Sequence, residues 1–362
     1  MIDTSKTYWV LTNENEIQNM IQYKDGFVKV ESDVYEKDLC TGIVFASEDI
    51  FSCVNDNTRY IRQISIPNNA NTIELKVENV DGKPITLYKT DRAIFESRRD
   101  FDFVTINELI DDYGVNIDCS NSKLLSYFCN MENMTMCRYL IKKGIRLDYP
   151  YLRQQPLVHA IKSKNIAIFK LIFKSMKDYR SQSSYMRDLM MYIVCHGTIE
   201  MLRYVMWYGA RVVAKTKSSI SYSEFQGRLI KQACLLGRLD MLRYLIDSLH
   251  VKINLYYNDS LEYAVLCEYE NIEMIRYLLS KGVNVHSNDD RAFRYAVERN
   301  RIATVYELVN AGANIHVYGD IALLVAYKNG FDDLLEYLVD LDEYNRESIH
   351  CIDRYTDIAH TL

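Results

Sequence analysis

The 362-residue sequence has little of what makes chains flexible, and it lacks the long apolar runs of membrane proteins. Only four prolines and thirteen glycines are present, too few for extended linkers, so we expect nearly the whole chain to be ordered. No stretch approaches the roughly 20 apolar residues that a membrane-spanning helix needs. The first residues show no basic segment followed by an apolar one, so no export signal is expected. These absences predict a soluble protein.

The motifs of common enzyme and metal-binding classes are also missing. No G-x-x-x-x-G-K-[ST] loop, G-x-S-x-G turn or H-E-x-x-H motif occurs. The nine cysteines include no C-x-x-C pair, and many lie in partly apolar contexts where a free thiol behaves as a small hydrophobe. Cys195 and His196 are adjacent, which is poor geometry for two metal ligands on one helix. We therefore expect no catalytic site, no metal and no cofactor, and a reducing intracellular compartment.

The net charge of −6 is unevenly distributed. Residues 331–362 contain nine acidic and two basic residues, a net charge of −7, which leaves +1 for residues 1–330. A nearly neutral body argues against broad nucleic-acid binding, which needs a basic face. We interpret the acidic tail at 342–362 as a solubilising end, with binding of a basic partner as the alternative.

A repeat with a period of 30 residues is the main feature of the chain. Similar segments start at Asn271, Arg301 and Phe331, and Gly282 and Gly312 keep the same spacing. Each segment has apolar residues at one position and then three, six and seven residues later, a stripe along one helical face. The glycine predicts the end of that helix. A shorter predicted helix precedes each stripe and carries a small residue at a fixed place: Ala160, Ala233, Ala264, Ala296 and Ala326.

This organisation resembles the ankyrin repeat, whose usual period is about 33 residues. The most specific segments are Leu-Leu-Ser-Lys-Gly-Val-Asn-Val at 278–285 and Leu-Val-Asn-Ala-Gly-Ala-Asn-Ile at 308–315. The resemblance implies a mainly α protein with an ankyrin-repeat solenoid over residues 101–341, and the short period implies short loops between units. After a degenerate start at 101–118, the predicted units are 121–148, 152–180, 185–213, 225–256, 258–286, 289–316 and 319–341.

Residues 1–100 lack the repeat and predict a small α+β domain of short strands with turns between them. Two short helices are expected, at Asn13–Gln22 and Glu48–Asn55. The predicted strands are Tyr8–Thr12, Phe27–Val30, Gly42–Ala46, Tyr60–Pro67, Thr72–Val77, Ile85–Tyr88 and Ala93–Phe95.

The N-terminal segment also resembles the leader domain that precedes ankyrin arrays in giant viruses of the mimivirus group. The resemblance is carried by Gly26-Phe27, by Cys-Thr-Gly-Ile-Val-Phe at 40–45 and by Ile-Arg-Gln-Ile-Ser-Ile-Pro at 61–67. The 29 tyrosines and the Ile/Asn/Lys-rich composition are typical of an AT-rich genome. The resemblance implies a viral protein made in the host cytoplasm, and it implies no catalytic residues.

A column of tyrosines recurs in register on the longer helices: Tyr139, Tyr204, Tyr244, Tyr277 and Tyr337. An arginine precedes four of them: Arg138, Arg203, Arg243 and Arg276. One interpretation is a stripe that stacks nucleic-acid bases and binds phosphates. We favour a structural role, because Glu200, Asp240 and Glu273 stand three positions before three of the arginines and can pair within the helix. The tyrosine rings should then be half-buried between adjacent helices.

Stacked repeats form a concave face from their short helices and loop tips, and tips can vary without disturbing the packing. Tyrosine and arginine are enriched at interfaces, and both occur at these tips. The alternative is that these are ordinary solvated turn residues. The candidate partner-binding residues are Tyr149, Arg153, Tyr256, Tyr257, Asn258, Asn288, Asp289, Arg291, Tyr318 and Asp320.

We expect a monomer that binds an unidentified protein, and neither nucleic acid nor a membrane. The alternative is an adaptor that recruits a ubiquitin-ligase or signalling complex through residues 1–100. A third hypothesis, an enzyme in residues 1–100, lacks the commonest general base because that segment contains no histidine. Only carboxylates such as Asp33, Glu36, Glu48 and Asp49 would be left for that chemistry.

Overall fold

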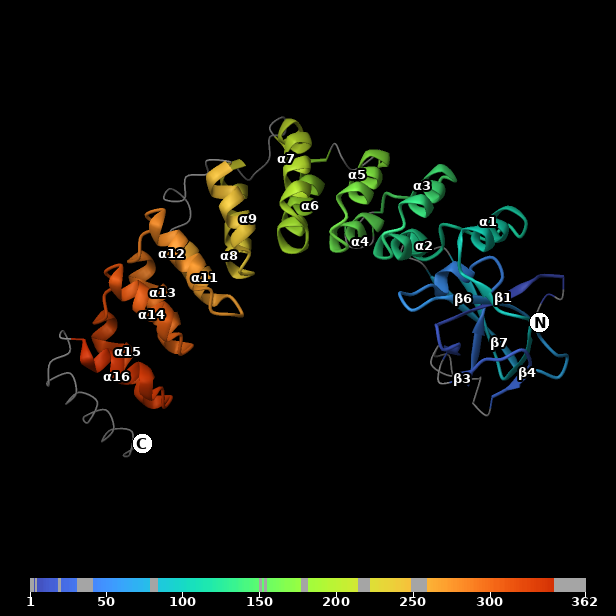
Figure 1. Ribbon diagram of the computed structural model, residues 1–362, viewed down its shortest axis with the longest axis horizontal. Coiled ribbons are helices and arrows are strands. Elements are labelled where there is room, and N and C mark those ends of the chain that lie inside the picture. The colour runs from blue at the N-terminus through green and yellow to red at the C-terminus, as the bar shows by residue number, and fades with distance from the viewer. Residues whose placement is uncertain are drawn as a thin grey trace. The chain divides into compact units, whose positions relative to one another are not determined.

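A computed structural model divides the chain into two compact units, Met1–Ser181 and Gln182–Leu362. Figure 1 shows strands at the start of the chain and helices along the rest of it. The structure describes residues 3, 5–18, 21–30, 42–78, 84–149, 152, 155–176, 182–213, 222–248 and 259–341.

The first unit begins with small antiparallel sheets. One sheet has the strand order β1-β6-β9-β4, with β10 also paired to β6; a second has the order β5-β8-β7, and β2 and β3 form a short hairpin. The strands are β1 Tyr8–Thr12, β2 Ile17–Gln18, β3 Ile21–Gln22, β4 Gly26–Lys29, β5 Ile43–Phe45, β6 Tyr60–Ser65, β7 Thr72–Glu78, β8 Pro84–Thr90, β9 Arg92–Phe95 and β10 Arg99–Asp100.

An aromatic core lies within these sheets. Tyr8, Tyr23 and Phe95 are each at most 3% exposed, and the rings of Tyr23 and Phe95 stack with their centroids 4.6 Å apart. A bridge between Trp9 and Ala46 connects the first sheet to the second. Side chains alternate between the two faces of a strand, so the apolar residues at every second position reach this core. The predicted strands are confirmed, with ends that differ by no more than a few residues.

The predicted helix at Asn13–Gln22 is wrong, because this segment forms the β2–β3 hairpin. The Asn13 side chain accepts a hydrogen bond from the backbone N–H of Ile17 at 2.9 Å, and Glu16 has a φ of 56°. Asparagine side chains commonly stabilise turns in this way, in competition with helix formation. The second predicted helix is a single 3-10 turn, η1 Ile50–Cys53.

Helix α1 (Phe103–Asp111) and a series of helix pairs follow the strands. In the first unit the pairs are α2 Cys119–Asn130 with α3 Met134–Lys142, and α4 Pro156–Lys162 with α5 Ile166–Ser175. In the second unit they are α6 Ser183–His196 with α7 Ile199–Val213, α8 Tyr222–Leu235 with α9 Leu239–Arg243 and η3 Tyr244–Ser248, α11 Ser260–Leu266 with α12 Ile272–Ser280, α13 Ser287–Glu298 with α14 Ile302–Asn310, and α15 Val317–Lys328 with α16 Asp332–Asp340. No helix in the described ranges combines the length and apolar composition needed to cross a bilayer.

Successive pairs pack against one another within each unit (Figure 1). In the first unit α2 packs against α4, and α3 against α5. In the second, the first helices of neighbouring pairs pack in the order α6, α8, α11, α13, α15. The five predicted small residues on these first helices are at most 2% exposed, which confirms their packing role: Ala160, Ala233, Ala264, Ala296 and Ala326.

Glycine ends several of the longer helices, as predicted. Gly144, Gly282 and Gly312 follow α3, α12 and α14 with φ values of 89°, 75° and 92°. A Cβ at these positions would meet no neighbour within 4 Å, so the backbone conformation alone favours glycine. Gly209 is an exception, because α7 continues through it to Val213.

Candidate protein-interaction surface

The turns that open α13 and α15 have an unusual backbone. Asn288, Asp289 and Asp290 have φ values of 52°, 56° and 52°. Tyr318, Gly319 and Asp320 repeat the pattern 30 residues later, with φ values of 52°, 67° and 63°. A residue other than glycine adopts this left-handed conformation at a cost of about 1–2 kcal/mol. Neighbouring side chains must therefore hold the turns in place.

Buried carboxylates supply that support. The Asp290 side chain is 6% exposed, accepts a hydrogen bond from the backbone N–H of Asn314 at 2.9 Å, and lies 3.1 Å from Nδ1 of His286. Glu262 on α11 is 5% exposed and accepts a hydrogen bond from the Asn288 side-chain amide. In the second turn, His316 Nδ1 lies 2.6 Å from Asp320 Oδ1. These contacts connect the first turn to α11 before it and to the backbone of Asn314 after it, and they stabilise the second turn from within.

An exposed aromatic ring of the second turn lies against the first turn. Tyr318 is 61% exposed, and its hydroxyl donates to Asp289 Oδ2 at 2.8 Å. The guanidinium of Arg294 lies 4.8 Å from the centre of the ring, within cation–π range. The hydrogen bond to Asp289 raises the pKa of the Tyr318 phenol, so the hydroxyl stays a donor near neutral pH. The ring is thus held in one orientation while most of its surface is exposed to solvent.

Arg294 also fixes the turn itself. It donates to the backbone carbonyls of Asn288 and Asp289, at 3.2 Å in both cases. Arg291, one helical turn earlier, is about half exposed and lies 3.7 Å from Glu262. We refer to Asn288, Asp289, Arg291, Arg294 and Tyr318 as the tip cluster.

The structure brings together four of the predicted contact residues in this cluster: Asn288, Asp289, Arg291 and Tyr318. Another predicted residue, Asp320, has its carboxylate in contact with His316 Nδ1 at 2.6 Å and is not part of the cluster. Arg294 was not predicted. Residues three apart lie on the same helical face, so the predicted residue Arg291 could have indicated Arg294 as a second candidate. Arg153, Tyr256, Tyr257 and Asn258 lie outside the described residues.

The expectation that Tyr149 lies at an exposed tip is wrong, because it is only 1% exposed. Its hydroxyl is 2.7 Å from Ser122 Oγ, its carbonyl accepts from Gln155 Nε2 at 2.8 Å, and the Arg146 guanidinium lies 4.7 Å from its ring centre. Tyr149 therefore belongs to the packing between α2 and the loop after α3. A polar loop sequence does not reveal that one of its rings points inward.

The tyrosine column has the predicted structural character. All five tyrosines are half-buried: Tyr139, Tyr204, Tyr244, Tyr277 and Tyr337. The guanidinium of Arg243 lies 5.5 Å from the ring centre of Tyr277 on the following pair. These rings therefore pack between helices, in keeping with a role in the scaffold.

The predicted pairing of the arginines within their own helices is wrong at two described positions. Arg276 bonds Glu307 of the next pair at 2.7 Å instead of Glu273. Asp240 bonds Arg238 at 2.8 Å. Residues three apart can meet on a helix, but Arg276 reaches a carboxylate on the next helix pair, and Asp240 pairs with an arginine only two residues before it.

The described residues that were candidates for catalysis form ion pairs or hydrogen bonds with neighbouring groups. Glu48 pairs with Lys6 at 2.7 Å, and Asp49 accepts from the backbone N–H of Thr86 at 2.9 Å. His159 contacts Asn130 at 3.1 Å, and burial lowers the pKa of its imidazole. Asp33 and Glu36 lie outside the described residues. Within the described ranges, no group of three or more His, Cys, Asp or Glu side chains could hold a metal ion.

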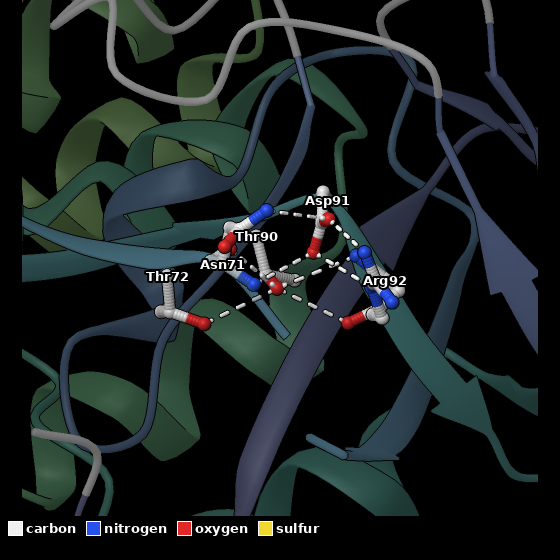
Figure 2. A network of polar contacts seen from close by, with 5 residues as sticks. All are labelled: Asn71, Thr72, Thr90, Asp91 and Arg92. Atoms are coloured by element: carbon white, nitrogen blue, oxygen red, sulfur yellow. Dashed lines mark hydrogen bonds and ion pairs between the residues drawn. The ribbon is translucent and has the colours of Figure 1, made fainter. Parts of the chain in front are cut away.

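A network of polar contacts in the strand region surrounds the buried Asp91 carboxylate (Figure 2). Asp91 is 5% exposed and accepts from the backbone N–H of Asn71 at 2.9 Å and from the Arg92 guanidinium at 2.6 Å. Thr90 donates to the Asn71 carbonyl at 3.1 Å. Burial alone would raise the pKa of Asp91, but the hydrogen bonds from Arg92 and Asn71 outweigh burial and lower it. The network joins the start of β7 to the β8–β9 turn.

The strand region also contacts the first helix pair. Within the first unit, α2 packs against η1 and the loop after it. Tyr127 donates to the Thr58 carbonyl, Lys123 to the Ser52 carbonyl and Asn130 to Asp56 Oδ1, each at 2.8 Å. Segment 52–58 thus takes the place that a preceding helix pair would occupy against α2.

The stacked helix pairs identify the chain as a repeat protein. A strand region packs on the first of these pairs. The sequence model of one family, ankyrin repeats in three copies, matches residues 261–348. Ankyrin repeats are therefore present in the part of the chain that holds α11 to α16 and the tip cluster. No curated protein matches this sequence.

Proposed function

We propose that this chain binds a protein partner through the concave face and loop tips of an ankyrin solenoid, with the tip cluster at the centre of the contact. Ankyrin repeats are generally protein-interaction modules. The observation that carries the proposal is the exposed Tyr318 ring, which Arg294 and Asp289 hold rigidly. Tyrosine and arginine dominate interface hot spots, and a rigid ring loses little entropy on binding.

The test uses peptides, so that it does not depend on knowing the partner. A library of random peptides is selected against the full chain, and the enriched peptides are measured against variants. Tyr318→Ala should weaken binding about 30-fold, the loss expected for a hot-spot side chain. Tyr318→Phe keeps the ring and should lose less.

Tyr269→Ala is the matched control, because this tyrosine is 74% exposed but lies in the turn between α11 and α12. The control should bind as well as the parent. Unchanged binding by Tyr318→Ala, with a loss in Tyr269→Ala, would move the contact to the other edge of the repeats.

The leader resemblance supports a finer version of this proposal, in which the partner is a host or viral protein in the cytoplasm of an infected cell. Proximity labelling from the full chain during infection tests that context. An adaptor role for the strand region would have to use a surface other than segment 52–58, because that segment already packs against α2.

A further inference from the structure

Strand β7 is the longest edge strand in the part of the chain that the structure describes. It is the last strand of the β5-β8-β7 sheet and pairs with β8 over all seven of its residues. The other end of this sheet is joined to the first sheet, because Ala46, directly after β5, forms a bridge to Trp9 of β1. A long edge strand presents a row of backbone donors and acceptors to which another strand can add.

The ladder with β8 fixes which backbone groups of β7 face outward. The Asp91 N–H donates to the Asn71 carbonyl at 3.2 Å, so these two residues form a hydrogen-bonded pair. Such pairs recur at every second residue of an antiparallel ladder, so the odd-numbered residues of β7 direct their N–H and C=O groups toward β8. Among the described residues, no backbone hydrogen bond reaches the other side of β7. The residues whose backbone groups face that side are Thr72, Glu74, Lys76 and Glu78.

The two faces of β7 differ in their side chains, because successive side chains of a strand point to opposite faces. On one face Leu75 is buried, whereas Val77 is 43% exposed. On the other face the charges alternate in sign, at Glu74, Lys76 and Glu78. The side chains of Glu74 and Lys76 are 44% and 71% exposed and lie 3.4 Å apart. The open edge therefore carries both a charge pattern and an apolar residue that a second strand could cover.

We propose that β7 pairs antiparallel with β7 of a second copy of the chain, about a two-fold axis at Leu75. This register pairs the whole strand, because it sets Thr72 opposite Glu78 of the second copy. Even-numbered residues then face even-numbered residues, so the outward N–H groups of each strand meet the outward carbonyls of the other. A two-fold contact uses the same surface on both chains, as most homodimers do. The contact is small, so a weak dimer replaces the monomer expected from the sequence.

The charges of β7 select the same register. Glu74 lies opposite Lys76 of the second copy, and Lys76 lies opposite Glu74 of the second copy. Opposite charges across two strands stabilise the pairing, whereas like charges destabilise it. An axis at Glu74 would oppose two glutamates, and an axis at Lys76 would oppose two lysines. The axis at Leu75 also sets Val77 opposite Ile73 of the second copy, which gives the exposed valine an apolar neighbour.

Sedimentation velocity of the full chain over a range of concentrations tests this pairing. Lys76→Glu and Glu74→Lys each place like charges opposite one another at two points of the dimer. Each variant alone should therefore raise the dissociation constant of the dimer about tenfold. An equal mixture of the two variants restores opposite charges at both points, so it should form a heterodimer with the affinity of the parent. Both side chains are exposed, and circular dichroism should show that both variants keep the parent fold.

Lys29→Glu is the matched control, because Lys29 is an exposed lysine on β4, the edge strand of the other sheet. It should dimerise as the parent does, and an equal loss in this control would contradict the pairing through β7. A mixture of the two β7 variants that binds no more tightly than either alone would also overturn the proposal. Addition of an extended segment of another protein is the other use of such an edge. In that case the parent would stay monomeric at every concentration, and the proposal would be wrong.

Discussion

The first helix pair and the last described pair face different neighbours. Against α2, the strand region supplies both aromatic packing and hydrogen bonds, and Leu124 and Leu125 are fully buried. On α15 and α16, Leu335 and Tyr327 remain partly exposed in the described structure. Both pairs carry the same kind of apolar stripe. A helix pair therefore does not bury its own stripe completely, and its stability depends on what packs next to it.

The pairs between them share a polar connection. Arg301, just before α14, donates to the carbonyls of Cys267, Glu268 and Tyr269 in the preceding pair. Arg238, at the matching position before α9, donates to the carbonyls of Val194, Cys195 and Gly197. Carbonyls at a helix end lack partners within their own helix. In both cases the next pair satisfies them.

The largest expected effect comes from removing the aromatic contact at the first pair. Phe101 is 7% exposed, and its ring centre lies 5.7 Å from that of Tyr127 and 6.2 Å from that of Phe51. Phe101→Ala should destabilise the first unit by about 3–5 kcal/mol, because it leaves a cavity. Urea unfolding, followed by Trp9 fluorescence in a Trp207→Phe background, measures this, since Trp9 lies in the first unit.

Val104→Ala is the control for that experiment. Val104 is 69% exposed, so its truncation should change the unfolding free energy by less than about 0.5 kcal/mol. Equal losses in the two variants would show that the contact between the strand region and α2 does not support the first pair.

A smaller effect is expected between interior pairs. Arg301 is 8% exposed, and Arg301→Gln removes donors from buried carbonyls, at a cost of about 1–3 kcal/mol. Faster hydrogen exchange in α11 and α14 measures the loss. Arg276→Gln removes an ion pair whose arginine side chain is 64% exposed, so it should cost less than about 1 kcal/mol. A larger loss in the Arg276 variant would contradict the importance of the carbonyl contacts.

The smallest effect concerns pH in the first unit. Burial, with a further contribution from Lys162, lowers the pKa of His159 below its ordinary value of 6.5. The unfolded chain then binds this proton more readily, so stability falls as the pH drops below 6.5 toward the lower folded value. His159→Gln should lose less stability than the parent between pH 7.5 and pH 5. Parallel curves for the two proteins would remove His159 as a source of acid sensitivity.

Much of the fold could be predicted because it follows local patterns. Short runs rich in aromatic and β-branched residues located β1 and β6, because such residues favour strands, and the three-to-four spacing of apolar residues located the helix pairs, because it places one face of each helix against a core. The pairing of β2 with β3 was missed because the Asn13 side chain accepts from the backbone N–H of Ile17 and so stabilises a turn just before β2. Of the tip cluster, Arg294 was missed because its role depends on a tyrosine 24 residues later.

The sequence by itself determined the helices, their apolar stripes, the small residues on the first helices and the glycines that end the longer ones, because each depends on backbone preference or on spacing within one element. Only the tertiary structure decided that Tyr149 is buried and Tyr318 exposed, and that Arg276 pairs with Glu307 instead of Glu273. Spacing along a helix states which way a side chain points. Its burial and its partner depend on what the neighbouring segment places there.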